Sequence, residues 1–260
     1  RMAAFAILLA LAAVFLPGLR KAFTYDEYQV LITTKDLENA EFFHVSVALS
    51  MCSVVFENAS VPIKDGAAVW AAIELFKIPV LVTADLDLTE LALADETAQT
   101  KTSSASITAL VRSPALIRDF LPCRVIVSIS STVDASRLNV SVAAQGAERS
   151  RVVTGPDLVD PLGTLSVTGP HVGFFAASTA STPARGLTIA ISHGNVNISS
   201  LTGARTANIT TISADVEIKS SHDMVVHQLE QPQAHFVLAG HCISSTSGSD
   251  PACFDGGTRP

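Results

Sequence analysis

The sequence predicts a mostly β protein with an N-terminal single transmembrane helix, a β-sandwich-like middle region and a short C-terminal β-solenoid. Three observations lead to this prediction: an uncharged apolar run at 2–19, alternating apolar and polar residues through the middle, and a pattern that recurs about every 20 residues across 187–239. The expected domains are an anchor at 1–21, a membrane-proximal β domain at 22–145, solenoid repeats at 146–241 and a disulfide-closed tail at 242–260.

The segment 2–19 carries no charge and is long enough to cross the hydrocarbon core of a bilayer as a helix. Arg20 and Lys21 close it, and we expect it to contact membrane lipid. A signal peptide and a buried core helix are the alternatives. The basic pair favours a cytoplasmic main domain, whereas the glycosylation sequons described below favour an extracellular or lumenal one. We therefore predict a single-pass membrane protein with its main domain outside the cytoplasm.

The residue pattern in the middle of the chain predicts a series of strands. Apolar residues alternate from Phe43 to Phe56, which indicates one buried face. The alanine content of 67–77 favours a short helix there. Further strands are expected at 30–33, 79–93, 106–111, 124–130 and 137–143, with a polar break at 145–151.

The repeat lies in the C-terminal half. Its apolar positions Ile189, Val196 and Ile198 recur as Ile209, Val216 and Ile218, then as Leu229, Phe236 and Leu238. Between them stand Asn195, Asp215 and His235 in one column and Asn197, Glu217 and Val237 in another. Val167 and Phe174 have the same spacing one rung earlier. A fixed period is typical of stacked repeats, while an antiparallel sandwich with regularly spaced strands is the alternative.

The amino-acid sequence of the first full rung resembles that of a known family. It runs Leu187-Thr-Ile-Ala-Ile-Ser-His-Gly-Asn-Val-Asn-Ile198 and continues to Leu201-Thr-Gly203. This resembles the "putative adhesin" type of β-helix repeat domain of bacterial and eukaryotic surface proteins, over about 165–240. The later rungs depart from it, with Ala214 and Ala234 where Gly194 stands in the first. The resemblance implies a surface scaffold.

Composition and motifs argue against several classes of function. The net charge of −7, without a basic cluster, makes a nucleic-acid partner unexpected. The chain has no nucleophile-elbow, phosphate-loop or zinc-protease motif, and we predict no enzyme, no cofactor and no metal. A metal site among four histidines and a calcium site among five acidic residues are the alternatives; these are His222, His227, His235 and His241, and Asp85, Asp87, Glu90, Asp95 and Glu96.

Four sequons indicate N-linked glycans. They begin at Asn58, Asn139, Asn197 and Asn208. Asn197 and Asn208 fall at outward positions of the repeat, where a glycan could project.

The 4 cysteines have no metal or redox spacing. We favour the pairs Cys52–Cys123 and Cys242–Cys253, because each stays within one predicted domain. The second pair would close the tail over the end of the solenoid. Two other connectivities and four free thiols remain open.

The sequence therefore predicts a non-catalytic structural or adhesion protein, a scaffold that contacts partner proteins or glycans within a surface assembly. An accessory subunit of an organellar membrane complex is the rival class. A carbohydrate-active β-helix enzyme is the third, and it would require an acidic pair on one strand face.

Overall fold

The computed structural model describes residues 24–59, 66–76, 83–93, 102–112, 121–146, 149–155, 158, 160–176, 184–201, 206–220, 224–228, 236–239, 242–247 and 250–251. The elements are β1 (Thr24–Thr33), α3 (Thr34–Asn39), β2 (Phe42–Ser50), β3 (Cys52–Ala59), β4 (Ala67–Phe76), β5 (Thr83–Leu93), β6 (Thr102–Arg112), β7 (Cys123–Ser130), η2 (Ala135–Arg137), β8 (Leu138–Ala144), β9 (Ser150–Thr154), β10 (Leu162–Ala176), β11 (Ala184–Leu201), β12 (Thr206–Ser220), β13 (Met224–Gln228), β14 (Phe236–Ala239), β15 (Cys242–Ser247) and β16 (Asp250–Pro251). The mostly β prediction is confirmed.

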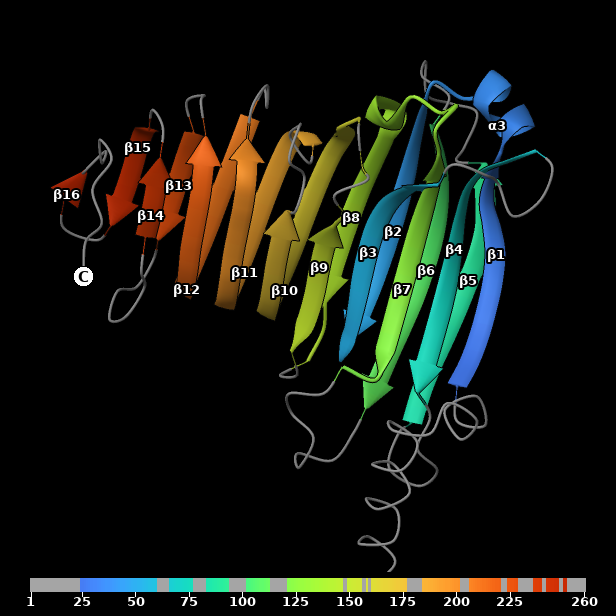
Figure 1. The fold of residues 1–260 in the computed structure, drawn as a ribbon, viewed down its shortest axis with the longest axis horizontal. Helices are drawn as coiled ribbons and strands as arrows, with labels where there is room; N and C mark the ends of the chain where they lie inside the picture. The colour runs from blue at the N-terminus through green and yellow to red at the C-terminus, as the bar shows by residue number, and fades with distance from the viewer. Residues whose placement is uncertain are drawn as a thin grey trace, which may run out of the picture.

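The strands stack as parallel rungs, each with two arms. The arms of one rung are separate strands in β2–β3, β6–β7 and β8–β9, whereas β10, β11 and β12 each run through both arms. First arms pair with first arms and second arms with second arms, which produces the two layers visible in Figure 1. The predicted separate sandwich-like region is therefore wrong, because β2, β3 and β6 to β9 belong to the same stack.

The order of the rungs differs from their order in the chain. β2 lies between β6 and β8 in one layer, and β3 lies between β7 and β9 in the other. The β2–β3 rung, which comes earlier in the chain, is thus enclosed by two rungs that come later, β6–β7 and β8–β9. The predicted domain boundaries stay predictions, although hydrogen bonding runs from β8 and β9 directly into β10.

The predicted columns of the repeat are largely confirmed by the register. Ile189 pairs with Ile209 and Val196 with Val216, and Val216 pairs in turn with Phe236. The earlier rung also fits, because Val167 pairs with Ile189 and Phe174 with Val196. One member is wrong: Val226, rather than Leu229, stands beside Ile209.

A single core fills the space between the two layers. Alternate residues of each arm point into it, including Val45, Val47 and Leu49 of β2 and Val54 and Phe56 of β3. The same cluster of buried side chains continues without a break to the later rungs and includes Ile209 and Val216 of β12. Each rung thus buries its apolar edge against its neighbours, as stacked repeats require.

The bend between the two arms needs unusual backbone at some rungs. Met51, between β2 and β3, has a φ of 53°, and Gly194 in β11 has a φ of 136°. A Cβ at Gly194 would lie 1.9 Å from the carbonyl oxygen of Val172. Glycine therefore allows neighbouring rungs to approach closely at this corner.

Antiparallel strands complete the other end of the stack. β4 pairs with β7, β1 with β4 and β5 with β6, all antiparallel. The expected helix at 67–77 is instead β4, whose residues 67 to 73 are buried in succession. Burial on both faces overrides the helical preference of alanine.

The predicted membrane helix requires correction. Residues 1–23 lie outside the described residues, and within the described part of the chain no helix has the length and apolar character needed to cross a bilayer. On this finding, the predictions of an N-terminal membrane helix and of a single-pass membrane protein are corrected.

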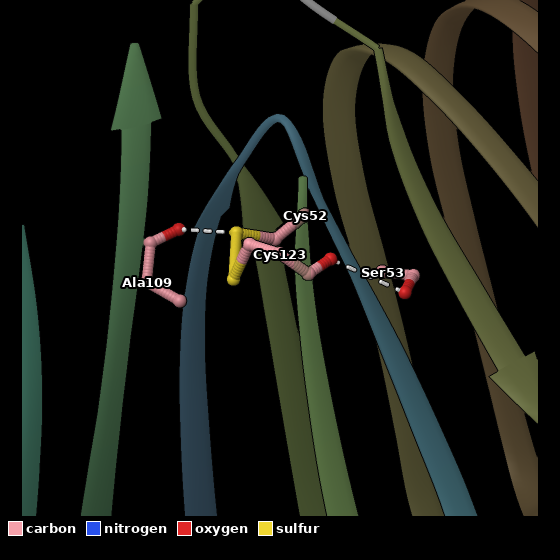
Figure 2. The surroundings of a disulfide bond; sticks show 4 residues. All are labelled: Cys52, Ser53, Ala109 and Cys123. Atoms are coloured by element: carbon pink, nitrogen blue, oxygen red, sulfur yellow. Dashed lines mark hydrogen bonds between the residues drawn. A yellow bond between two sulfur atoms is a disulfide. The ribbon is translucent and has the colours of Figure 1, made fainter. Parts of the chain in front are cut away.

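A disulfide joins β3 to β7. Cys52 and Cys123 are direct neighbours in the parallel register, with their Cα atoms 4.5 Å apart, and both are buried. Figure 2 shows the bond beside Ala109 of β6, whose carbonyl oxygen lies 3.2 Å from the Cys52 Sγ. A disulfide sulfur has no hydrogen to donate, so this contact is a hydrogen bond only when the thiol is reduced. The predicted Cys52–Cys123 pair is confirmed.

The core predicts a strong effect of charge at Val216, which is fully buried. We expect Val216→Asp to lower the free energy of unfolding by about 3 kcal/mol or more, because the carboxylate would lack a partner. Thr188→Asp, at an exposed position of β11, should cost less than about 1 kcal/mol. Urea unfolding followed by circular dichroism measures both. Equal midpoints for Val216→Asp and the unchanged protein would contradict the stacked core.

The disulfide closes a loop with a sequence separation of 71. Loop-closure entropy then predicts that Cys52→Ala together with Cys123→Ala lowers the free energy of unfolding by about 4 kcal/mol. The comparison is made by urea unfolding under oxidising conditions. A double variant as stable as the unchanged protein would show that the bond does not constrain the unfolded chain.

Candidate functional site

A pocket of about 400 Å³ lies where the second arms of three neighbouring rungs begin. It is lined by Leu121, Arg149, Ser150, Arg151, His171, Val172, Gly173, Phe175, His193, Gly194 and Asn195. The register places Arg151 of β9, Gly173 of β10 and Asn195 of β11 side by side in one row. Val153, Phe175 and Asn197 form the next row.

The missing side chain of Gly173 makes room for this pocket. A Cβ built there would lie 2.8 Å from the Cε2 atom of Phe175 and 3.4 Å from the Oδ1 atom of Asn195. The φ of Gly173 is not in the left-handed region that favours glycine, in contrast to that of Gly194. Glycine at 173 therefore supplies space rather than a special backbone conformation.

Arg151 forms one wall of the pocket. Its guanidinium carbon lies 4.3 Å from the centroid of the Phe175 ring, a cation–π contact. The five N–H groups of a guanidinium lie in its plane, so stacking on a ring leaves them available to other partners. Within the described residues, the side chain of Arg151 makes no hydrogen bond or ion pair. An exposed guanidinium held in this way is suited to a planar anion.

Two stacked histidines form a second wall. His171 and His193 are register neighbours whose ring centroids are 5.0 Å apart, with 22° between the ring planes. Burial lowers the pKa of His171, and the neighbouring His193 and Arg149 lower that pKa further. His171 is therefore held neutral at neutral pH, and an anion in the pocket would favour its protonated form.

The polar lining adds hydrogen-bonding groups. Asn195 is exposed and its amide both donates and accepts. Ser150 is 2% exposed, and its hydroxyl has no hydrogen-bond partner in the described structure. The site thus combines cations, an aromatic ring and neutral polar groups, on a chain whose net charge is −7. This arrangement can bind an anionic group that also carries hydroxyls.

The outer face of the first arms has a different character. It carries a row of small polar side chains in register, namely Ser106, Ser46, Ser141, Ser166, Thr188 and Asn208. Some hydroxyls on this face bond to a neighbouring strand, since Ser46 donates to the carbonyl of Ala105 at 3.4 Å. Substitutions on this uncharged face can therefore serve as controls for substitutions in the pocket.

The structure separates the predicted sequons by their surroundings. Asn208 is exposed and Asn197 is half-buried, both at outward positions as expected. The half-buried Asn139 accepts a hydrogen bond from the Thr164 hydroxyl at 2.9 Å. Asn58 stands in the inward register beside Ile129, and its side-chain oxygen is buried without a partner. Glycosylation stays a prediction at all four positions, and the geometry favours Asn208.

The other predicted sites are only partly described. Cys242 begins β15, and Cys253 lies outside the described residues, so their bond stays a prediction. His222, His235 and His241 also lie outside, as do Asp95 and Glu96. His227 is in β13, and Asp85, Asp87 and Glu90 are in β5. Over the ranges given above, no three histidine, cysteine or acidic residues are grouped as a metal site requires.

Sequence reasoning missed the residues of the pocket. Arg149 and Arg151 fell in the stretch read as a polar break, and Gly173 fell within a rung that was read only for its apolar positions. A signal was present, because His171 and His193 share the offset of 22 residues that relates Val167 to Ile189.

Comparisons with known proteins give little further information. No model of a protein family matches the chain, and no curated protein sequence matches it. Among solved structures, the chain is similar to a crystal structure described as a "putative cell adhesion protein" from Clostridium sporogenes. The identity is 8%, the TM-score is 0.35, and the match covers 79% of this chain and 72% of that one. At this TM-score the likeness does not define the fold or the function.

The lowered pKa of His171 predicts a pH dependence of stability. The unfolded chain, with the ordinary histidine pKa of 6.5, takes up the proton more readily than the folded protein. This contribution to stability is therefore complete above pH 6.5 and is lost as the pH falls below it. We expect His171→Gln to reduce the fall in the free energy of unfolding on acidification, as measured by urea unfolding across this range. Identical pH dependence in both proteins would rule out a half-buried imidazole that stays neutral in the folded protein.

Proposed function

We propose that the protein is a non-catalytic adhesion or scaffold protein that contacts a partner, a glycan in the first instance, through outward side chains of its stack. The observation that carries the proposal is the pocket around Gly173, built on a stack of rungs with one shared core. Its lining side chains come from three adjacent rungs that are hydrogen-bonded to each other.

The rigidity of the site supports binding rather than chemistry. β9 is hydrogen-bonded to β3 and β10, and β10 to β9 and β11, so the strands under the pocket have neighbours on both sides. Side chains held on strands keep their spacing better than side chains on loops. A contact surface that is already ordered loses little conformational entropy when the partner binds.

The lining groups are also those of a recognition site. A guanidinium and an amide donate hydrogen bonds in fixed directions, and an aromatic ring supplies apolar surface. These are the roles of Arg151, Asn195 and Phe175 in the proposed contact.

The proposal predicts selective and reversible glycan binding. The protein is immobilised and tested on an array of neutral and acidic glycans. We expect the combined variant Arg151→Gln and Asn195→Ala to lose the bound glycans, because it removes the two main hydrogen-bonding side chains of the pocket. The matched control is Thr168→Ala with Thr188→Ala on the other layer, where both threonines are exposed. It should bind as the unchanged protein does.

Mass spectrometry of the eluted glycans tests the non-catalytic part of the proposal. We expect every bound glycan to be recovered with its original mass. Shortened products would identify an enzyme instead. A complete lack of glycan retention, or equal losses in the pocket variant and the control, would contradict binding through this pocket.

A further inference from the structure

We infer that the pocket is a subsite for one carboxylate-bearing sugar, a uronic acid unit of an acidic glycan. This inference rests on the proposed binding function and specifies its ligand. Four features carry it: the unpaired guanidinium of Arg151, the hollow at Gly173, the exposed amide of Asn195 and the histidine pair.

The carboxylate is assigned to Arg151. Its guanidinium lies over the Phe175 ring, and no described residue accepts a hydrogen bond from its N–H groups. A guanidinium can donate two parallel hydrogen bonds to one carboxylate. Arg149, which also lines the pocket, adds positive charge nearby. A carboxylate therefore suits the free N–H donors of the Arg151 guanidinium and its charge.

The remainder of the pocket is larger than a carboxylate requires. Its volume of about 400 Å³ lies within the range of small-molecule sites and has room for a sugar ring. Gly173 leaves the floor open, the half-buried ring of Phe175 offers apolar surface, and Asn195 can both donate to and accept from hydroxyls. These groups correspond to the faces and edges of a uronic acid.

A peptide carboxylate fits the site less well than a sugar. Extended peptides gain much of their affinity by pairing with the free edge of a sheet. β9, β10 and β11 each have hydrogen-bonded strands on both sides, so none presents a free edge here. A peptide would have to bind through its side chain alone, whereas a sugar offers hydroxyls around its whole ring.

Charge should make the site selective within this protein. An overall net charge of −7 disfavours general attraction of an acidic polymer, so binding depends on the local cations. On the same outward row, Arg124 stands beside Ser53, which pairs in turn with Arg151. Arg124 is thus an exposed arginine about 10 Å away and outside the pocket.

The histidines link this binding to pH. The groups that face His171 are Arg149, just before β9, Arg151 on β9 and His193 on β11, while Asp215 of β12 stands beside Asn195 in the register. A bound carboxylate favours protonated His171 and offsets the effect of the neighbouring cations. Uronate affinity should therefore rise as the pH falls, whereas affinity for a neutral sugar should not.

The test uses small defined probes and isothermal titration calorimetry with the full chain. Methyl glucuronide is compared with methyl glucoside, which has the same ring without the charge, with acetate, which has the charge without the ring, and with N-acetylglutamate amide, which presents a peptide-type carboxylate. Four variants are titrated: Arg151→Gln, Gly173→Ala, His171→Gln and the matched control Arg124→Gln. Gly173→Ala adds one methyl group that meets the movable ring of Phe175, so its fold should be preserved.

We expect methyl glucuronide to bind at least about tenfold more tightly than methyl glucoside, because hydrogen bonds to charged groups are the stronger class. It should exceed acetate and N-acetylglutamate amide by about the same factor, because neither has the sugar ring and its hydroxyls to fill the rest of the pocket. Arg151→Gln and Gly173→Ala should each weaken glucuronide binding at least about tenfold, and Arg124→Gln should change it less than about twofold. His171→Gln should remove the rise in affinity between pH 7.5 and 5.5.

Other outcomes overturn the inference in distinct ways. Equal affinity for acetate would reveal a simple anion site, equal affinity for N-acetylglutamate amide a peptide site, and equal affinity for methyl glucoside a neutral sugar site. An equal effect of Arg124→Gln would reveal unspecific electrostatics. If no probe binds while the glycan array is positive, the uronate inference fails and the proposed function stands. If the array is negative as well, both fail.

Discussion

The parallel, in-register pairing of the rungs is the constraint on which the rest of the structure depends. Because first arms pair only with first arms, equivalent residues of successive rungs form straight columns. An inward column is therefore mostly apolar, as with Phe174, Val196 and Val216, and the polar residues buried in it are mostly small, such as Ser150 and Thr154. An outward column is free to vary, and this freedom permits arginine, glycine and asparagine to stand side by side at the pocket.

The predictability of the fold follows from this pairing. Where consecutive rungs are also neighbours in the stack, as in β10, β11 and β12, the period was visible and the register was predicted correctly. Between residues 42 and 154 the stacking order departs from the chain order, so a constant period could not show. Leu229 was predicted wrongly because the loop before β13 is shorter than a constant period requires, so that Val226 pairs with Ile209. The strand β4 was missed because tertiary burial, rather than local preference, decides its conformation.

The site was less predictable than the fold for a physical reason. Its hollow arises because Gly173 has no side chain. A glycine leaves a hollow only where larger side chains flank it, and the flanking residues Arg151 and Asn195 come from other strands. The cation–π contact also joins positions 151 and 175, which a strand-by-strand reading treats separately. His171 and His193 are separated by the same 22 residues as Val167 and Ile189, but the prediction considered only apolar columns and so did not include them.

The enclosed position of the β2–β3 rung has a consequence for protein synthesis. Its hydrogen-bonding neighbours, β6–β7 and β8–β9, are complete only when the ribosome has reached Thr154. At the usual rate of translation, the segment from Ala59 to Thr154 takes roughly 5–20 s to make. Both edges of the rung are open until β7 ends at Ser130, and one edge stays open until β9 is made; an open edge can pair with strands of other nascent chains. The stack therefore cannot grow rung by rung in the order of the chain, and the edges of the early strands stay exposed until the later rungs close around them.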